Sequence, residues 1–305
     1  MIFSYTKLTM LARRTFIALS IVCLLAGCAQ TSPQFEIAKS EHADGILAQQ
    51  IFETTYIRHG GAHISALNDV NVAIDGEWHY LITKIQPEVS DKHYRQQSEE
   101  RILIKPSIYA ALYNGDAGTK QVLRSTQEIE VAYNNEQNVN TTTEKATALT
   151  ADAFYLFTLG PLALHDRVRQ WVRLEDGKVE DKSYYRINGE LLPGIGLSNS
   201  DFITLWIDKA TNLTFRMHIT LEGFESTKGA HVDTTFSDYI RLEKFTFPTH
   251  FFERVRGPIS IDAHEWWYTG IDINRGLGQQ DLQINEWSQN AAMPAVKLKH
   301  KPARE

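Results

Sequence analysis

The sequence predicts a mainly β domain (α+β) with antiparallel strands, a helix near its start and an apolar helix in the middle. Apolar residues alternate with polar ones in the run Leu213, Phe215, Met217, Ile219 and Leu221. This period of two is typical of a strand with one dry and one solvated face. Residues 47–56 instead carry an apolar stripe with helical spacing, and residues 150–164 are almost wholly apolar.

The N-terminal segment is predicted to be a signal peptide that spans residues 1–27. Arg13 and Arg14 precede the uncharged run TFIALSIVCLLAG, which is too short for a permanent membrane helix and fits the apolar core of a signal peptide. The run ends in LAGC, which resembles the lipobox of bacterial lipoproteins. Small residues there admit the signal peptidase, and the thiol of Cys28 takes the diacylglycerol. Met10 is an alternative start.

The residues after Cys28 are expected to tether the domain to a membrane. Ala29 and Gln30 are not acidic, and by resemblance to enterobacterial lipoproteins this favours outer-membrane sorting with the domain facing the periplasm. Residues 28–41 are polar and predict a lipidated, flexible tether with a palmitate-type acyl anchor. A single domain is expected at residues 42–290, followed by a polar tail at 291–305.

Charge and cysteine content exclude several classes of function. The formal net charge is -6, and loss of Lys7, Arg13 and Arg14 with the signal peptide leaves about -9. An acidic surface argues against nucleic-acid binding and gives no electrostatic attraction to anionic lipids. Only two cysteines occur; Cys23 leaves with the signal peptide and Cys28 is acylated. A disulfide framework and a cysteine-bound zinc are therefore excluded, and no cofactor is expected.

The first folded element is predicted to be a helix that ends at a glycine pair. Leu47, Ala48, Ile51, Phe52, Thr55 and Tyr56 form its apolar stripe. Gly60 or Gly61 can take the left-handed conformation that ends a helix, with His59 in the last turn. A metal site would need His59 and His63 on one helical face, which the glycines make unfavourable. An esterase-type oxyanion loop would need a Gly-x-Ser-x-Gly elbow, which the chain lacks.

A series of strands is predicted to follow. Val70, Val72 and Ile74 begin the alternation, and a polar loop of hairpin length at 208–212 precedes the strand with the cleanest pattern. Pro248 and Pro258 fit only edges, bulges or strand ends. Further strand-like runs occupy 78–85, 127–133, 202–207, 231–240, 245–255 and 261–273.

Residues 150–164, TADAFYLFTLGPLAL, interrupt the β pattern. Thr150 or Asp152 can cap a helix there, and Gly160-Pro161 is expected to kink or end it. Because such a helix is apolar all round, it must be buried on every side, where it can plug the mouth of a curved sheet. An ordinary strand or core helix is the alternative.

This layout, with the stretches DFITLWIDKATNLTFRMHITLEG, TTFSDY and FPTHFFE, resembles the LolA/LolB/LppX group of periplasmic carriers and lipoproteins. The resemblance implies an antiparallel, unclosed half-barrel whose concave side, covered by helices, holds acyl chains without catalysis. The protruding apolar loop with which LolB engages membranes has no match in this sequence. The functional arginine of the carriers cannot be assigned to any one residue either.

A lipid, acyl or lipidated ligand is therefore the expected partner, bound in an apolar groove. The candidate lining residues could equally form an ordinary core; they are Phe154, Phe157, Leu162, Phe215, Met217 and Ile219. Arg167, Arg169 and Arg173 follow the apolar helix and are candidates for contacts with a lipid headgroup, with a solvated strand as the alternative.

Two other functions remain open from the sequence. His264-Glu265 begins like a zincin motif, but Tyr268 stands where a second histidine is needed, so an enzyme is not expected and no metal site is predicted. A protein-interaction, sensor or envelope-assembly role would use the aromatic run Trp266-Trp267-Tyr268. On a strand, neighbours in this run face opposite sides, so exposure of the run would favour a protein partner.

Overall fold

A computed structural model of the chain describes residues 30–36, 45–138, 140–285, 287 and 296–297. None of the helices in this part of the chain is long and apolar enough to cross a membrane. The helices are α2 (Pro33–Glu36), α3 (Gly45–Arg58), α4 (Tyr80–Ile85), α5 (Pro87–Ser90), α6 (Thr141–Leu159) and α7 (Pro161–Leu164), with 3-10 turns η2 (Gly61–Ala66), η3 (Glu225–Thr227) and η4 (Gln279–Leu282).

The strands account for most of the remaining chain. They are β1 (Asp69–Trp78), β2 (Gln97–Leu103), β3 (Ile108–Gly115), β4 (Gly118–Arg124), β5 (Ile129–Tyr133), β6 (Glu136–Gln137), β7 (Val168–Val179), β8 (Lys182–Leu191), β9 (Asp201–Asp208), β10 (Thr214–Thr220), β11 (His231–Ser237), β12 (Ile240–Leu242), β13 (Phe245–Phe247), β14 (His250–Gly257), β15 (Ile261–Ile273) and β16 (Val296–Lys297).

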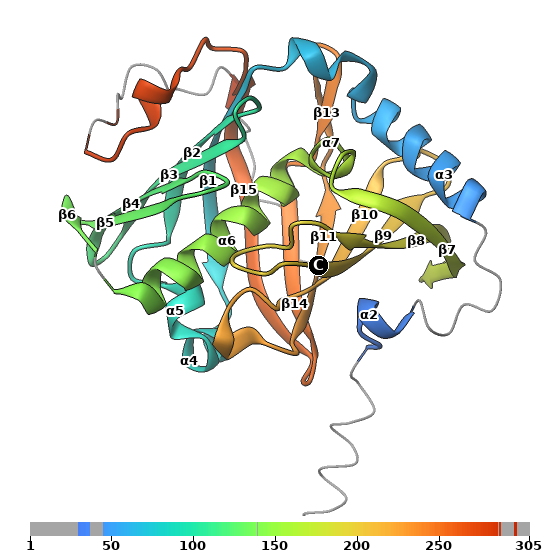
Figure 1. The fold of residues 1–305 in the computed structure, drawn as a ribbon, viewed down its shortest axis with the longest axis horizontal. Helices are drawn as coiled ribbons and strands as arrows, with labels where there is room; N and C mark the ends of the chain where they lie inside the picture. Colours follow the sequence, from blue (N-terminus) through green and yellow to red (C-terminus); the bar gives the residue numbers. More distant parts are fainter. Residues whose placement is uncertain (1–29, 37–44, 139, 286, 288–295, 298–305) are drawn as a thin grey trace, which may run out of the picture.

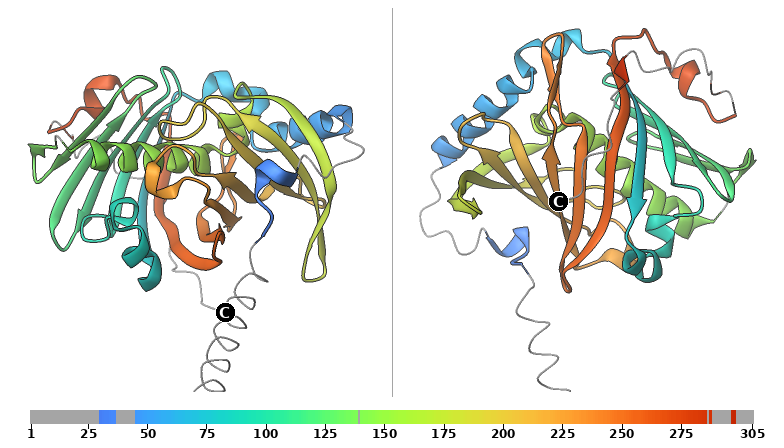
Figure 2. Two further views of the ribbon diagram at one scale, coloured as in Figure 1. Left: turned by 60° about the horizontal axis from the view of Figure 1, so that its bottom comes forward. Right: turned by 180° about the vertical axis from the view of Figure 1, so that it is seen from behind.

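The main antiparallel sheet has fourteen strands: thirteen follow the order β6-β5-β4-β3-β2-β1-β15-β14-β11-β10-β9-β8-β7, and β16 pairs with β15 off this path. The sheet has two wings, which join where β1 pairs with β15 and Val70 lies opposite Ile273. The first wing is β1 to β6 and the second is β7 to β11 with β14 and β15, while β12 and β13 form a separate two-stranded sheet. The end strands β6 and β7 do not pair with each other, and the sheet curves around its helices (Figures 1 and 2). The predicted unclosed half-barrel is confirmed.

The apolar helix α6 crosses the concave side of this sheet (Figure 2). It begins earlier than the predicted caps at Thr150 or Asp152, because Asn140 Oδ1 accepts hydrogen bonds from the backbone N–H groups of Thr142 and Thr143. Gly160, with φ of 55°, separates α6 from α7, as the Gly-Pro pair predicted. The helix therefore spans the interior instead of covering only its mouth.

Helix α3 ends where the glycine pair predicted. Gly60 has φ of 105°, and a Cβ atom there would lie 2.6 Å from the backbone oxygen of Lys244, so only glycine fits. His59 is buried, its Nδ1 lies 3.1 Å from the Thr246 oxygen, and its Nε2 accepts from the Thr214 N–H. Burial lowers the pKa of His59 to about 4. His63 is exposed, so the two histidines do not converge.

One predicted strand is wrong. The run 78–85 leaves the sheet after Trp78, and Tyr80 to Ile85 form α4. This short helix packs against β15 and buries Ile82 and Thr83, while Tyr80 and Leu81 face solvent. The apolar residues of this run follow neither a clear period of two nor a long helical stripe, so pattern alone could not distinguish the two structures.

Residues 30–36 pack on the convex face of the sheet instead of forming a free tether. Helix α2 lies on β9 and β10, where Asn188 Nδ2 donates to the Pro33 oxygen at 2.9 Å and Thr204 Oγ1 donates to Glu36 at 2.8 Å. Arg186 forms an ion pair with Glu36. Cys28 and most of the predicted tail lie outside the described residues, as does the whole signal peptide.

Candidate functional site

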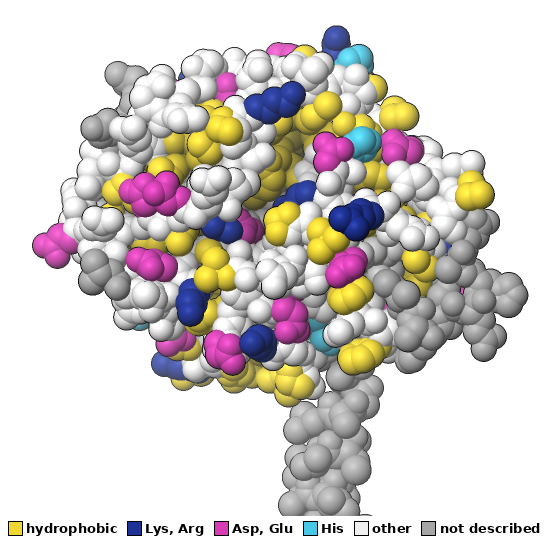
Figure 3. Space-filling view, in the orientation of Figure 1, with side chains coloured by type: hydrophobic (Ala, Val, Ile, Leu, Met, Phe, Trp, Pro, Cys, Tyr) yellow, Lys and Arg dark blue, Asp and Glu magenta, His cyan; other side chains and the backbone are white. Residues whose placement is uncertain are grey.

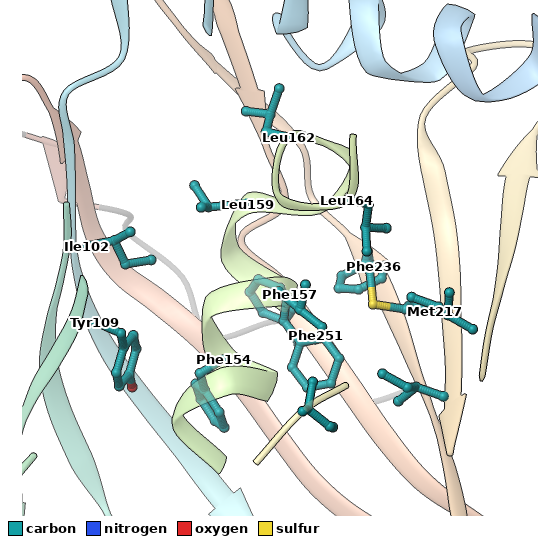
Figure 4. Packing of buried hydrophobic residues seen from close by; sticks show 14 of the residues in the cluster. Ile102, Tyr109, Phe154, Phe157, Leu159, Leu162, Leu164, Met217, Phe236 and Phe251 are labelled. Carbon is teal, nitrogen blue, oxygen red and sulfur yellow. The ribbon is translucent and has the colours of Figure 1, made fainter. Parts of the chain in front are cut away.

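The concave interior is lined by apolar side chains from both wings. Buried residues of β1, β2, β3, β8, β9, β10, β11, β14 and β15 form one cluster around α6. Aromatic rings occupy its centre: Phe154 of α6 lies 5.0 Å from Trp266 of β15, and Trp266 stacks on Phe251 of β14 at 4.9 Å. Figure 4 shows Phe154 and Phe251 between Ile102 and Tyr109 on one side and Met217 on the other.

Five of the six predicted lining residues meet in this interior. Phe154, Phe157, Leu162, Met217 and Ile219 all belong to the buried cluster, and Figure 4 places Met217 close to Leu164 and Phe236. In the space-filling view, apolar side chains lie in a hollow on the face that carries α6 (Figure 3). The same side chains thus form the packed core around α6.

Phe215 does not join them, and its assignment to the lining needs correction. The register of β10 against β9 shifts between Thr214 and Arg216, a bulge that changes the side to which Phe215 points. The ring stacks on Tyr184 at 4.2 Å and is absent from the buried cluster. A bulge cannot be read from alternation, which assumes an uninterrupted ladder.

The polar side of β10 is buried, where the sequence predicted a solvated back. His218 is fully buried, and its Nε2 lies 2.7 Å from His231 Nδ1. Asp233 accepts from Arg254 Nε at 2.8 Å and forms an ion pair with Arg256 at 3.1 Å. These groups lie on the convex side, where Arg254 and Arg256 cover Asp233. Burial lowers the pKa of His218 well below its ordinary value.

One end of the interior is polar and contains a buried arginine that sequence reasoning missed. Arg95 precedes β2 and is 5% exposed. Its guanidinium carbon lies 5.1 Å from the ring centres of Trp78 and Tyr113 and 5.2 Å from that of Phe154, the arrangement of a cation–π contact. Arg95 Nη1 donates to the Val89 oxygen at 2.7 Å. Within the described residues no carboxylate pairs with it inside 4 Å.

A small cavity of about 10 Å³ borders Arg95. His264 and Ser98 also line it, and two buried atoms around it, Arg95 Nε and His264 Nδ1, have no hydrogen-bond partner. The volume matches roughly one water molecule. Buried polar groups without hydrogen-bond partners destabilise a fold. The apolar interior therefore ends at groups that can form a hydrogen bond with a polar ligand atom.

Glu100 of β2 lies at the same end and is fully buried. Ser98 Oγ donates to its Oε1 at 3.0 Å, whereas its Oε2 has no partner. Burial raises the pKa of Glu100 from 4.5 to about 7, although nearby Tyr109, Ser98 and Arg95 act in the opposite direction. Its carboxyl group therefore holds a proton in mildly acidic conditions.

Replacing Glu100 by glutamine is expected to remove part of the pH dependence of stability. Because the pKa of Glu100 is raised in the folded protein, its protonated carboxyl contributes fully to the free energy of unfolding below pH 4.5. This contribution is lost as the pH rises through about 7. The free energy of unfolding should fall by about 3 kcal/mol over this range. The Glu100→Gln variant should not show this fall, because glutamine does not ionise. Urea unfolding of both proteins at pH 4 and pH 8 measures the difference; parallel pH profiles would contradict the assignment.

Helix α6 is fastened to both wings through one polar cluster, which we call the clasp: Arg124, Asp152 and Gly196. Arg124 of β4 binds Asp152 of α6 through two hydrogen bonds of 3.0 Å. The backbone N–H of Gly196, between β8 and β9, donates to Asp152 at 2.8 Å, and its oxygen accepts from Arg124 at 3.0 Å. The clasp thus joins strands of opposite wings over the helix.

The three arginines predicted for headgroup contacts do not converge. Arg167 donates to the Pro193 and Gly194 oxygens, Arg169 is exposed on β7, and Arg173 is paired with Asp176. No shared anion site is formed by them.

A separate open groove of about 920 Å³ runs between α3 and the edge strand β7. Ile46 and Ile57 line it and are largely exposed, and Arg169 contributes from β7. In contrast, Trp266, Trp267 and Tyr268 are all buried, which removes the aromatic run as an exposed partner surface.

A chain of hydrogen bonds links Ser237, His250 and Glu265. His250 Nδ1 lies 2.9 Å from Ser237 Oγ, and its Nε2 lies 2.9 Å from Glu265. The order matches that of a nucleophile triad, yet the three groups stand on neighbouring paired strands and line neither cavity described above. Among the described residues, no group of three or more His, Cys, Asp or Glu could hold a metal ion.

Comparison with known proteins gave matches only among solved structures. No family model matches the chain, and no curated protein matches it. A LolA superfamily protein from Nitrosomonas europaea is 12% identical, with 77% of this chain and 97% of that chain covered and a TM-score of 0.46. A putative outer membrane lipoprotein-sorting protein domain from Vibrio parahaemolyticus is 12% identical, with 79% and 98% covered and a TM-score of 0.43.

Lipoprotein LppX from Mycobacterium tuberculosis is 14% identical, with 57% of this chain and 90% of that chain covered and a TM-score of 0.26. These likenesses carry no argument about a ligand or an activity. What the structure itself shows is the architecture that the layout of the sequence predicted, an antiparallel sheet whose end strands do not pair with each other.

Proposed function

We propose that this chain is an outer-membrane lipoprotein, anchored through acylated Cys28 and facing the periplasm, whose half-barrel binds an acyl chain without catalysis. Residues 1–27 act as its signal peptide, and residues 42–290 form a single binding domain. The ligand is a lipid, a free acyl compound or a lipidated molecule.

The observation that carries this proposal is the combination of an apolar interior with a buried, unpaired cation at one end. A protein core needs no guanidinium, and burying one without a carboxylate is unfavourable. The direct contacts of the Arg95 guanidinium are aromatic rings, the Tyr113 hydroxyl and one backbone oxygen, whereas Glu100 and Glu253 interact with it without forming an ion pair inside 4 Å. An acyl ligand with an anionic end satisfies both parts, because its chain enters the apolar space and its charged end meets Arg95.

Binding requires room that the interior lacks while α6 is in place. Helix α6 lies close to β3, β4 and β5 of the first wing, and it meets β11 of the second wing through side-chain contacts such as Phe157 with Phe236 at 6.1 Å. An acyl chain would therefore enter between α6 and the second wing, with the clasp released. Each buried CH₂ group contributes about 0.8 kcal/mol, so a long acyl chain can offset loss of the clasp.

The interior can be tested by native mass spectrometry on residues 29–305 produced in the periplasm without Cys28. Co-purified acyl ligand, identified after organic extraction, is the expected result. A mass that matches the protein alone, unchanged after incubation with phospholipids and fatty acids, would contradict the proposal.

The groove between α3 and β7 supports a second candidate, a protein-interaction or sensor module. Among the described residues, strand β7 ends the sheet and pairs only with β8, so its other side can accept an extended peptide by β-augmentation. Ile46 and Ile57 would then contact its side chains. A ligand-free interior would make this candidate the preferred one.

A further inference from the structure

Five exposed apolar side chains gather at one end of the molecule. They belong to α2, to α4 and to the turn between β14 and β15, and these three elements lie at the same end in Figures 1 and 2. We call them the basal patch: Phe35, Tyr80, Leu81, Ile85 and Ile259. Apolar side chains line the corresponding lower rim in Figure 3. Large exposed apolar groups concentrated in this way indicate a contact surface.

The chain leaves the domain at this same end. The Gln30 N–H donates to the Arg256 oxygen at 3.1 Å, and Arg256 Nε donates to the Gln30 side chain at 2.9 Å. Arg256 is three residues before Ile259 of the basal patch. Gln30 is therefore fixed beside the turn between β14 and β15.

Only two residue steps separate Gln30 from Cys28. Two fully extended residues reach roughly 7 Å, so acylation of Cys28 would hold the basal patch at the membrane surface. A protein partner would have no room between the patch and the lipid. We infer that the basal patch inserts into the membrane interface and fixes the orientation of the anchored domain; this inference rests on the proposed anchor.

The chemistry of the patch suits the interface more than a charged lipid surface. Tyr80 is 73% exposed, and Lys84 Nζ lies 5.4 Å from its ring; aromatic rings and lysines both favour the headgroup region. The neighbouring charges are mixed, with Glu88 and Asp262 exposed beside Lys84. Insertion should therefore depend on apolar contact and change little with salt.

The test places one environment-sensitive NBD label on the full chain, expressed with its own N-terminal segment and reconstituted in phosphatidylcholine vesicles. Ile259→Cys reports on the patch. Ile57→Cys, on α3 and 59% exposed against 41% for Ile259, is the control. A blue-shifted emission at 259, quenched by brominated acyl chains, with an aqueous spectrum at 57 is expected. Leu81→Glu in the Ile259→Cys protein should reduce the shift.

Equal aqueous spectra at both sites in the acylated, vesicle-bound protein would overturn the inference. Intact mass separates this failure from failure of the anchor, since acylation of Cys28 changes the mass of the chain. If Cys28 is unmodified, Ile259→Cys is combined with Cys23→Ser and Cys28→Ser and mixed with excess vesicles. A blue shift at residue 259 would then support membrane insertion of the basal patch without an acyl anchor. The absence of a shift would rule out both the insertion and the anchor.

Discussion

Exchanging residues 1–28 for a secretory signal peptide that is completely removed is expected to release the whole protein from the membrane into the soluble periplasmic fraction. The physical reason is that one acyl chain binds a bilayer only marginally, whereas several chains on one cysteine hold it stably. The basal patch alone supplies a few side chains and should not replace this anchor. Cell fractionation with intact mass measurement tests the prediction.

The second cysteine provides a matched control for this exchange. Cys23→Ser lies in the same segment and should leave both the membrane fraction and the mass of the mature protein unchanged, because Cys23 leaves with the signal peptide. A native protein whose Cys28 is unmodified would refute the anchor, as would an exchanged protein that still sediments with membranes.

Replacing Arg95 by methionine is expected to weaken retention of a long-chain fatty acid by about 100-fold. Truncating one partner of a buried, hydrogen-bonded charge pair costs about 3 kcal/mol, and that energy corresponds to roughly two factors of ten in affinity. A fatty alcohol of equal length lacks the charge, so its binding should change little. Competition between acid and alcohol in wild type and variant measures the difference.

Two further variants distinguish ligand binding from a structural role of Arg95. Arg95→Lys keeps the positive charge and should recover part of the preference for the acid, while Arg169→Met, on the exposed part of β7, should have no effect. Equal loss of acid and alcohol, together with a lower melting temperature, would mean that Arg95 only supports the packing of Trp78, Tyr113 and Phe154.

The sequence predicted the architecture because its strongest patterns come from the longest elements. The bounds of β15, residues 261–273, and the stop of α3 at Gly60 were both predicted from local residues. Strands β2, β3, β4 and β8 were not predicted, and β7 was predicted only as the solvated strand that was the alternative to a headgroup site. In β2, for example, the charged Glu100 and Arg101 are buried, so alternation between apolar and polar residues gives no signal there.

The polar part of the site was not predictable for a related reason. Arg95 lies in the polar stretch DKHYRQQSEER, where an arginine normally suggests a solvated loop. Its burial depends on Trp78 and Phe154, which are remote in sequence and approach only through sheet curvature and the position of α6. Likewise, no local pattern shows that residues 30–36 pack on β9 and β10.

The junction between β1 and β15 determines when this protein can finish folding. Each wing consists mainly of strands paired with neighbours close in sequence, but the two wings join only through strands about 200 residues apart, where Val70 meets Ile273. During synthesis, the first wing leaves the ribosome long before β15 is made. Its apolar face must remain shielded over that interval, so the chain is most vulnerable to aggregation and proteolysis until its last long strand is delivered.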